Sequence, residues 1–194
     1  MNVKSTIIGL KSERRLSINE KDKNMKFQEL AAARYSCRKM TDQKVDDELV
    51  EQLIATANLA PTAVNKQPFK IFWMKSDKAK EAIHQATRYT FGAETFLIVG
   101  YKEDAAWVRA SDGHNFAEVD ATIVATHLML DIEDRGLATT WVGSFDCPLL
   151  KSLVPELAEY GLIAIFPIGY AAEDGTPSPR HAVRKPKEEV LECL

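Results

Sequence analysis

The sequence is poor in cysteine, and its histidines form no metal-binding pattern. Its three cysteines include no C-x-x-C pair; they are Cys37, Cys147 and Cys193. The four histidines lie far apart, without the spacing that zinc ligands show. This pattern argues against a disulfide framework and a structural zinc site, and it fits a reducing compartment.

Long apolar runs and a surplus of positive charge are absent as well. No apolar stretch approaches the roughly 20 residues that a membrane-spanning helix needs. A net charge of -3 gives no electrostatic reason to expect binding to nucleic acid or to a membrane surface. The N-terminal segment is polar and lacks the apolar centre of a secretory signal, which predicts a cytoplasmic protein.

Two common nucleotide-binding motifs are also missing. No G-x-G-x-x-G follows a predicted strand, and no G-x-x-x-x-G-K-[ST] occurs anywhere in the chain. A Rossmann nicotinamide site and a P-loop are therefore disfavoured.

Helical and strand patterns alternate irregularly along residues 26–194, which we predict to form one domain behind a polar, poorly packed leader over residues 1–25. Apolar spacing predicts a long central helix over 116–135. Residues 102–115 are expected to form an exposed loop, and 173–194 to lie over a surface as extended chain. The alternation favours an α+β or three-layer fold over a regular βαβ winding. The other expected elements are helices over 27–34, 49–60, 78–88 and 148–154, and strands over 69–74, 95–101, 137–145 and 161–171.

A short loop near the start, Arg34-Tyr35-Ser36-Cys37-Arg38, carries two arginines and a hydroxyl. Such a group can hold a phosphate dianion, because guanidinium makes charge-assisted and partly bidentate hydrogen bonds. Arg180, Arg184 and Lys185 in the C-terminal tail either complete this phosphate site or only keep the tail soluble. A solvated basic loop is the alternative for residues 34–38.

A second motif, Pro61-Thr62-Ala63-Val64-Asn65-Lys66-Gln67-Pro68-Phe69, joins a predicted helix to a predicted strand. The amides of Asn65 and Gln67 pair a donor with an acceptor and so match the imide-like edge of a heterocycle. The two prolines stiffen the loop and lower the entropy cost of ordering those amides. An ordinary helix-to-strand turn is the alternative.

A third motif, Trp141-Val142-Gly143-Ser144-Phe145, ends a predicted strand. Glycine lets a ligand ring approach the backbone, where exposed N–H groups can bind it. A tight turn after a core strand is the alternative.

In their order and spacing, these motifs resemble those of the nitroreductase-like FMN-dependent oxidoreductase family, over residues 26–194. Thr62 and Phe69 stand where the family often has Ser and Trp, and both changes keep the chemical character. The motifs that carry the resemblance are Arg34-x-Ser36-x-Arg38, Pro61-Thr62-x-x-Asn65-x-Gln67-Pro68-Phe69, Asp120-Ala121, Gly136-Leu137-x-x-x-Trp141-Val142-Gly143 and Arg184-Lys185-Pro186.

The resemblance implies an α+β fold with three layers, α/β/α, in which helices flank a mostly antiparallel sheet and one long helix is central. It also implies an intertwined homodimer that binds two FMN molecules non-covalently at its interface, each touched by both subunits. Pro61 and Thr62 are then expected to line the cofactor from the neighbouring subunit or close beside it.

The same resemblance assigns parts of the cofactor to particular residues. It places Arg34, Ser36 and Arg184 near the phosphate or ribityl chain, and Arg38 near the pyrimidine side of the ring. Backbone amides at Gly143 and Ser144 are expected to face ring atoms N5 and O4, with the second motif along the same cofactor. The full expected cofactor-binding set is Arg34, Tyr35, Ser36, Arg38, Pro61, Thr62, Asn65, Gln67, Val142, Gly143, Ser144, Arg180 and Arg184.

The activity that the resemblance implies is electron transfer from NAD(P)H to a nitroaromatic, quinone or similar small organic acceptor. Donor and acceptor would use the same flavin face in turn, which predicts ping-pong kinetics. No side chain is expected to act as an acid–base catalyst, and Arg38 would stabilise the negative charge of the reduced ring.

Several alternatives stay open on the sequence alone. One is a flavin-binding or storage protein with little turnover, and another is a non-flavin interaction module. Specialised flavin reactions such as reductive dehalogenation or flavin fragmentation rely on extra segments, whereas the loop 102–115 is short and predicts a more open acceptor pocket. Cys37 offers a rival chemistry as a thiolate between two arginines, although the sequence ties no histidine or acid to it.

Overall fold

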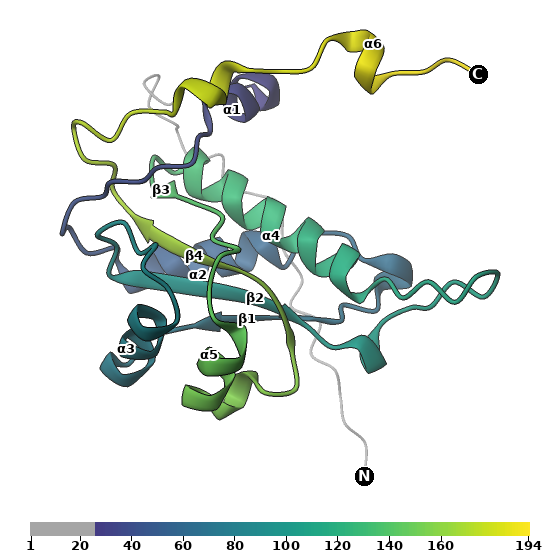
Figure 1. Ribbon diagram of the computed structural model, residues 1–194, viewed down its shortest axis with the longest axis horizontal. Coiled ribbons are helices and arrows are strands. Elements are labelled where there is room, and N and C mark those ends of the chain that lie inside the picture. The colour runs from purple at the N-terminus through teal and green to yellow at the C-terminus, as the bar shows by residue number, and fades with distance from the viewer. Residues whose placement is uncertain (1–25) are drawn as a thin grey trace, which may run out of the picture.

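The middle of the molecule is an antiparallel sheet of four strands in the order β1-β2-β4-β3 (Figure 1). The computed structural model describes residues 26–194, so the leader predicted over residues 1–25 lies outside the described residues. The strands are β1 (Phe69–Trp73), β2 (Thr95–Tyr101), β3 (Ala138–Thr139) and β4 (Gly161–Gly169).

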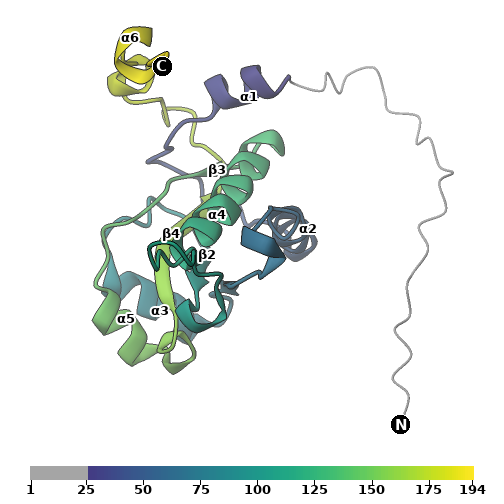
Figure 2. The same cartoon turned by 90° about the vertical axis from the view of Figure 1, so that its right-hand side faces the viewer.

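Helices cover both faces of this sheet, which confirms the predicted three-layer α/β/α arrangement (Figure 2). One face carries α2 (Asp47–Ala57) and the long α4 (Ala117–Asp134). The other face carries α3 (Asp77–Ala86) and α5 (Cys147–Leu153). A short helix, α1 (Phe27–Ala33), lies outside the layers and contacts α4.

The central strands serve two cores because successive side chains of a strand point to opposite faces. Leu97 and Val99 of β2 pack with α2 and α4, whereas Phe96 and Ile98 pack with α3 and α5. All four side chains are fully buried. This two-sided burial explains why β2 is a continuous apolar run without alternation of polar residues.

A single glycine ends α4 at its C-terminus. Gly136 has a φ of +70°, a conformation that residues with a side chain adopt only at a steric cost. The Gly136 N–H donates to Glu133 O at 2.9 Å and the Leu137 N–H to Ile132 O at 3.0 Å, which closes the last turn of the helix. The predicted helix over 116–135 is confirmed, with α4 beginning one residue later and ending one residue earlier.

The strand predicted over 137–145 is mostly wrong, because only Ala138 and Thr139 pair regularly with β4. Beyond them the chain keeps a single bridge between Val142 and Ile165. The loop 34–38 lies along this segment, where the Thr140 hydroxyl donates to the Cys37 carbonyl and the Cys37 N–H donates to Thr139 O. The segment leaves the sheet after Val142.

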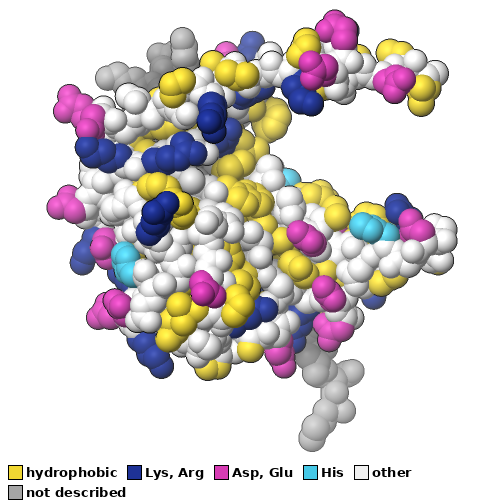
Figure 3. Space-filling view, in the orientation of Figure 1, with side chains coloured by type: hydrophobic (Ala, Val, Ile, Leu, Met, Phe, Trp, Pro, Cys, Tyr) yellow, Lys and Arg dark blue, Asp and Glu magenta, His cyan; other side chains and the backbone are white. Residues whose placement is uncertain are grey.

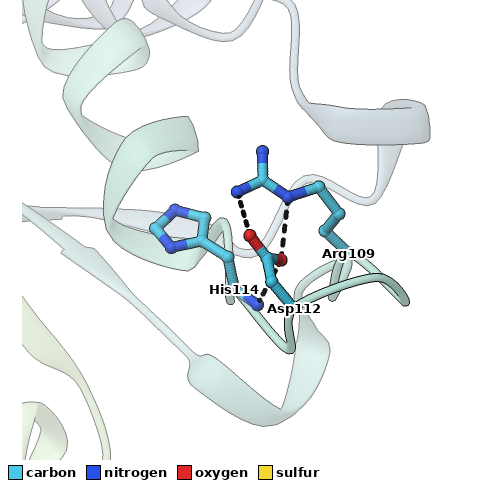
Figure 4. A network of polar contacts seen from close by, with 3 residues as sticks. All are labelled: Arg109, Asp112 and His114. Carbon is cyan, nitrogen blue, oxygen red and sulfur yellow. Dashed lines mark hydrogen bonds and ion pairs between the residues drawn. The ribbon is translucent and has the colours of Figure 1, made fainter.

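The loop predicted over 102–115 contains more structure than expected. A 3₁₀ turn (Glu103–Ala105) is followed by a hairpin over residues 107–116, which projects beyond the layers (Figure 1). Arg109 donates through Nε to Asp112 Oδ1 at 2.8 Å, and Asp112 Oδ1 also accepts from the His114 N–H at 3.2 Å (Figure 4). These contacts hold the hairpin in one shape.

The C-terminal tail begins beside α1 and then leaves the body of the molecule (Figure 1). It contains a 3₁₀ turn, η4 (Pro179–Ala182), and one short helix, α6 (Lys187–Val190). Residues 182–194 are all exposed, so the expectation of extended chain covering a surface is wrong for this last part. No helix within 26–194 has the length and apolarity to cross a bilayer.

Candidate functional site

A cavity of about 650 Å³ lies between the loop 34–38 and the tail segment 176–184. It brings together five residues that the sequence predicted for a phosphate site, from the two ends of the described chain. We call it the basic cavity, and its lining residues are Arg34, Ser36, Arg38, Thr176, Ser178, Arg180, His181 and Arg184.

The four arginines of the basic cavity have no acidic partners. None of them forms an ion pair with a carboxylate from residues 26–194. Arg34 and His181 interact electrostatically with the carboxyl group of Glu133 in α4. Burial raises the pKa of Glu133, and the positive charges of Arg34 and His181 partly oppose that rise. The cavity is thus a concentration of uncompensated positive charge, visible as dark-blue side chains in the upper part of Figure 3.

Two side chains hold the walls of the basic cavity together. The Tyr35 hydroxyl donates to Gly175 O at 2.6 Å, and His181 Nε2 donates to Ala32 O at 3.1 Å. The pKa of Tyr35 is raised to about 12, mainly by burial and secondly by the contact with Cys37. The phenol therefore remains a donor at neutral pH. The predicted role of Tyr35 at the cofactor stays a prediction, and its contacts show how it fixes the tail.

Cys37 is fully buried between the two arginines of the first motif, and its Sγ donates to Lys39 O at 3.2 Å. A nucleophile has to reach its substrate, so this burial disfavours the thiolate alternative. No group of three or more potential metal ligands gathers within the described residues either.

The second motif lies away from the basic cavity. Its turn, residues 62–67, contacts the first turn of α4, where the Ala63 N–H donates to Asp120 Oδ1 at 2.8 Å. Arg34, in contrast, interacts electrostatically with Glu133, which lies at the other end of the same helix. From Asp120 to Glu133 the helix rises about 20 Å. One chain therefore does not bring Asn65 and Gln67 to the arginines.

The turn 62–67 has an unusual backbone. Val64, Asn65 and Gln67 have φ values of 45°, 56° and 50°, which place three residues with side chains in the left-handed region. The Gln67 Nε2 group donates to Asn65 Oδ1 at 2.9 Å, so the two predicted amides lie side by side. Both side chains are exposed, as expected for a pair that meets a ligand.

The third motif lies next to the arginine loop. The Cys37 N–H donates to Thr139 O at 3.0 Å, which ties the loop 34–38 to the segment leading to Gly143. Gly143 and Ser144 are exposed, and their N–H groups donate to no acceptor within 26–194. A Cβ atom added at Gly143 would meet nothing within 4 Å. The backbone at Gly143 is therefore sterically open, and the approach of a ligand ring to it stays a prediction.

Sequence reasoning missed several residues around these motifs. Thr176, Ser178 and His181 line the basic cavity, and the two hydroxyls preceding Arg180 were a signal that was available. Thr87 Oγ1 donates to Ser144 O at 2.8 Å across 57 positions, a contact for which the sequence holds no local sign.

A family model described as the nitroreductase family matches residues 31–93 and 86–170. A crystal structure of a nitroreductase family protein from Clostridium difficile 630 is similar, with 30% identity and a TM-score of 0.79 over 87% of this chain and 98% of that chain. A structure from Exiguobacterium sibiricum, provisionally named a nitroreductase and solved in complex with FMN, has 21% identity and a TM-score of 0.73 over 87% of this chain and 97% of that chain.

Two curated relatives are similar over most of this chain. A Streptococcus pyogenes protein, provisionally named an NAD(P)H nitroreductase, is 27% identical over 87% of this chain and 99% of its own length. Iodotyrosine deiodinase 1 from Homo sapiens is 21% identical over 87% of this chain and 68% of its own length. Together with the matched family model, these findings show that the chain belongs to the nitroreductase family.

Proposed function

We propose that this chain is an NAD(P)H-dependent FMN oxidoreductase whose basic cavity binds the FMN phosphate. The observation that carries the proposal is the convergence of four arginines, from residues 34–38 and 180–184, that form no ion pair with any carboxylate of the described part of the chain. A phosphate dianion relieves their mutual repulsion and accepts charge-assisted hydrogen bonds from them. The provisional names of relatives and the FMN complex of a structural neighbour support the same cofactor and donor.

The residues next to the cavity suit the ring of FMN. Gly143 leaves open space above its backbone, and the free N–H groups of Gly143 and Ser144 are donors for ring acceptors. Arg38 lines the cavity and would stabilise negative charge on the ring. FMN, when bound, supplies the redox chemistry, and the protein supplies binding and electrostatics. With one face serving donor and acceptor in turn, we expect ping-pong kinetics with nitroaromatics, quinones or similar acceptors.

We further propose that the working unit is a homodimer with each FMN at the interface. The turn 62–67 and the basic cavity lie about 20 Å apart along α4, so side chains from both cannot surround one ring within a chain. A two-fold dimer solves this geometry, because the turn of one copy can meet the cavity of the other. The cysteine usage supports a cytoplasmic location.

The proposal is tested by titrating the purified protein with FMN and then adding NADH or NADPH without oxygen. We expect a yellow complex that bleaches on addition of one or both nicotinamides and recovers its colour with a quinone. Protein that stays colourless after incubation with excess FMN would overturn the proposal. A complex that binds FMN but is not reduced would favour the flavin-storage alternative.

Reductive dehalogenation is the second candidate, because iodotyrosine deiodinase 1 is among the relatives. Release of iodide from an iodinated tyrosine by the reduced complex would favour it. Reoxidation by quinones without iodide release would favour the nitroreductase-like activity.

A further inference from the structure

Asp120 is a carboxylate that the fold buries without satisfying it. It is 1% exposed, in the first turn of α4. Its Oδ1 accepts one hydrogen bond, from Ala63, while its buried Oδ2 receives none from residues 26–194. A buried carboxyl oxygen without a hydrogen-bond partner costs stability. The presence of this residue therefore calls for a role other than stability.

The contact partner of Asp120 belongs to the most strained segment of the described chain. Val64 is β-branched and adopts a φ of 45°, a conformation that is costly for such a residue. Its side chain is 68% exposed, so packing does not compensate for the strain. Left-handed residues of this kind persist only where surrounding contacts hold them, and they gather at ligand sites.

Within residues 26–194, the Asp120 contact is the one hydrogen bond that ties the turn 62–67 to another part of the molecule. The other bonds are internal to the turn: the Asn65 N–H donates to Thr62 O, the Lys66 N–H to Ala63 O and the Gln67 N–H to Thr62 Oγ1. Internal bonds shape the turn, whereas the bond to α4 sets where it lies.

We infer that Asp120 is a positioning residue for the cofactor site: its carboxylate holds the turn 62–67 in its left-handed form and thereby presents Asn65 and Gln67 as a paired amide edge. Beyond the bond between Gln67 Nε2 and Asn65 Oδ1, the pair offers Gln67 Oε1 as an acceptor and Asn65 Nδ2 as a donor. Such an edge suits the pyrimidine ring of a flavin. The inference rests on the proposed function in taking FMN as the ligand.

The test compares Asp120→Ala with Asp120→Asn in the full-length protein. In the FMN-free protein, amide hydrogen exchange of residues 63–67 is expected to speed up in Asp120→Ala. FMN affinity, measured by flavin fluorescence, is expected to fall about tenfold, since the hydrogen bond that holds the turn is lost. Asp120→Asn keeps an acceptor for Ala63 and is expected to restore both readouts. Asp131→Ala is the matched control, because it removes an aspartate of the same helix whose partner is Arg135.

A second variant separates positioning from general stability. Asparagine adopts the left-handed region more readily than valine, so Val64→Asn lowers the strain that Asp120 has to hold. In the Asp120→Ala background we expect Val64→Asn to recover most of the lost FMN affinity. A loss caused by poor folding of α4 would not be recovered by a change at this exposed position.

The outcomes distinguish this inference from the proposed function. If Asp120→Ala leaves the exchange of residues 63–67 unchanged, the inference fails, whether or not FMN binds. If exchange speeds up but FMN affinity stays at the wild-type value, the link to the site fails. If wild-type protein does not bind FMN, the proposed function and the inferred cofactor role both fail. Faster exchange in Asp120→Ala would then still show that Asp120 holds the turn, whatever the ligand is.

Discussion

The basic cavity at the C-terminal end of α4 and the turn 62–67 at its N-terminal end differ in what is left unbalanced. Within residues 26–194, the cavity gathers four arginines without a carboxylate ion-pair partner, whereas the turn has a strained backbone and contacts a buried carboxyl group with one unbonded oxygen. The two regions therefore differ in kind: one presents positive charge, and the other presents side chains on a strained backbone. Under the proposed function, the first would bind a phosphate and the second would present amides to a ring.

The strongest test removes charge from the cavity alone. We expect the double variant Arg34→Ala with Arg184→Ala to weaken FMN binding about a hundredfold, because hydrogen bonds between charged groups contribute ~1.5–3 kcal/mol each. Fluorescence titration measures the change. Arg109→Ala is the control for loss of an arginine outside the cavity, because Arg109 lies in the hairpin and pairs with Asp112. Wild-type affinity in the double variant would show that the arginines do not bind FMN.

Mixing two damaged chains tests whether cavity and turn meet across an interface. One chain carries Arg34→Ala, and the other carries Asn65→Ala with Gln67→Ala. Random pairing in a two-fold dimer makes about half of the dimers mixed, each with one intact site, so about a quarter of all sites should regain FMN. Native mass spectrometry verifies the mixed dimers. Absence of recovery in verified mixed dimers would contradict the shared site.

A smaller effect is expected from filling the open space above the third motif. Gly143→Ala adds a methyl group that meets no atom of the chain within 4 Å, so the thermal midpoint should not change. The same methyl group would obstruct a ring lying on this backbone, and we expect FMN affinity to fall about tenfold, as overpacking costs ~1–3 kcal/mol. Unchanged FMN affinity would show that the flavin ring does not lie on the backbone of Gly143.

The smallest effect concerns Glu133, beside the basic cavity. Burial raises its pKa, so the folded state binds a proton more readily than the unfolded state does. This contribution to stability is full below the unfolded-state pKa and is lost as pH rises through the folded-state pKa. Glu133→Gln should therefore have a higher thermal midpoint than the wild type at neutral pH. This difference should disappear at about pH 4. An equal gain at both pH values would contradict this account. Loss of the carboxylate should also tighten FMN binding slightly.

Much of the fold could be predicted from apolar patterning. The run over 95–101 coincides with β2, and α4 lies within one residue of its expected bounds at each end, because long buried elements leave a strong periodic signal. The helix predicted to reach residue 60 ends at Ala57, and Asp46 stands at its start without a side-chain capping bond. Such ends depend on local bonds that apolar spacing does not encode.

The rest of the fold depends on polar contacts between distant residues. The strand over 137–145 was overestimated, because residues 139 and 140 also bond to Cys37, about 100 positions away, and only Ala138 and Thr139 pair regularly with β4. The hairpin over 107–116 was missed because a salt bridge and aromatic contacts, not apolar alternation, hold it together. Neither kind of contact leaves a mark within a short window of sequence.

The candidate site likewise contains some features that the sequence predicts and others that only the packed structure reveals. Arg34, Ser36 and the arginines of the tail were predicted together and do line one cavity, because residue type alone indicates affinity for an anion. Asp120 belongs to a motif that carries the resemblance, and the structure shows that its Oδ1 accepts a hydrogen bond from the Ala63 N–H. Its burial, and the strain of the turn that it holds, became apparent only from the packed structure.

The hairpin over residues 107–116 closes most of its bonds on itself. Arg109 pairs with Asp112 and the ring of Trp107 packs on Phe116, while Asn115 makes the anchoring bond to Glu103 O at 2.9 Å. Such a self-contained finger can be lengthened, shortened or rewritten in evolution with little penalty to the sheet beneath it. Changes of sequence in this hairpin can therefore alter the surface chemistry of the protein while the packing of the core stays the same.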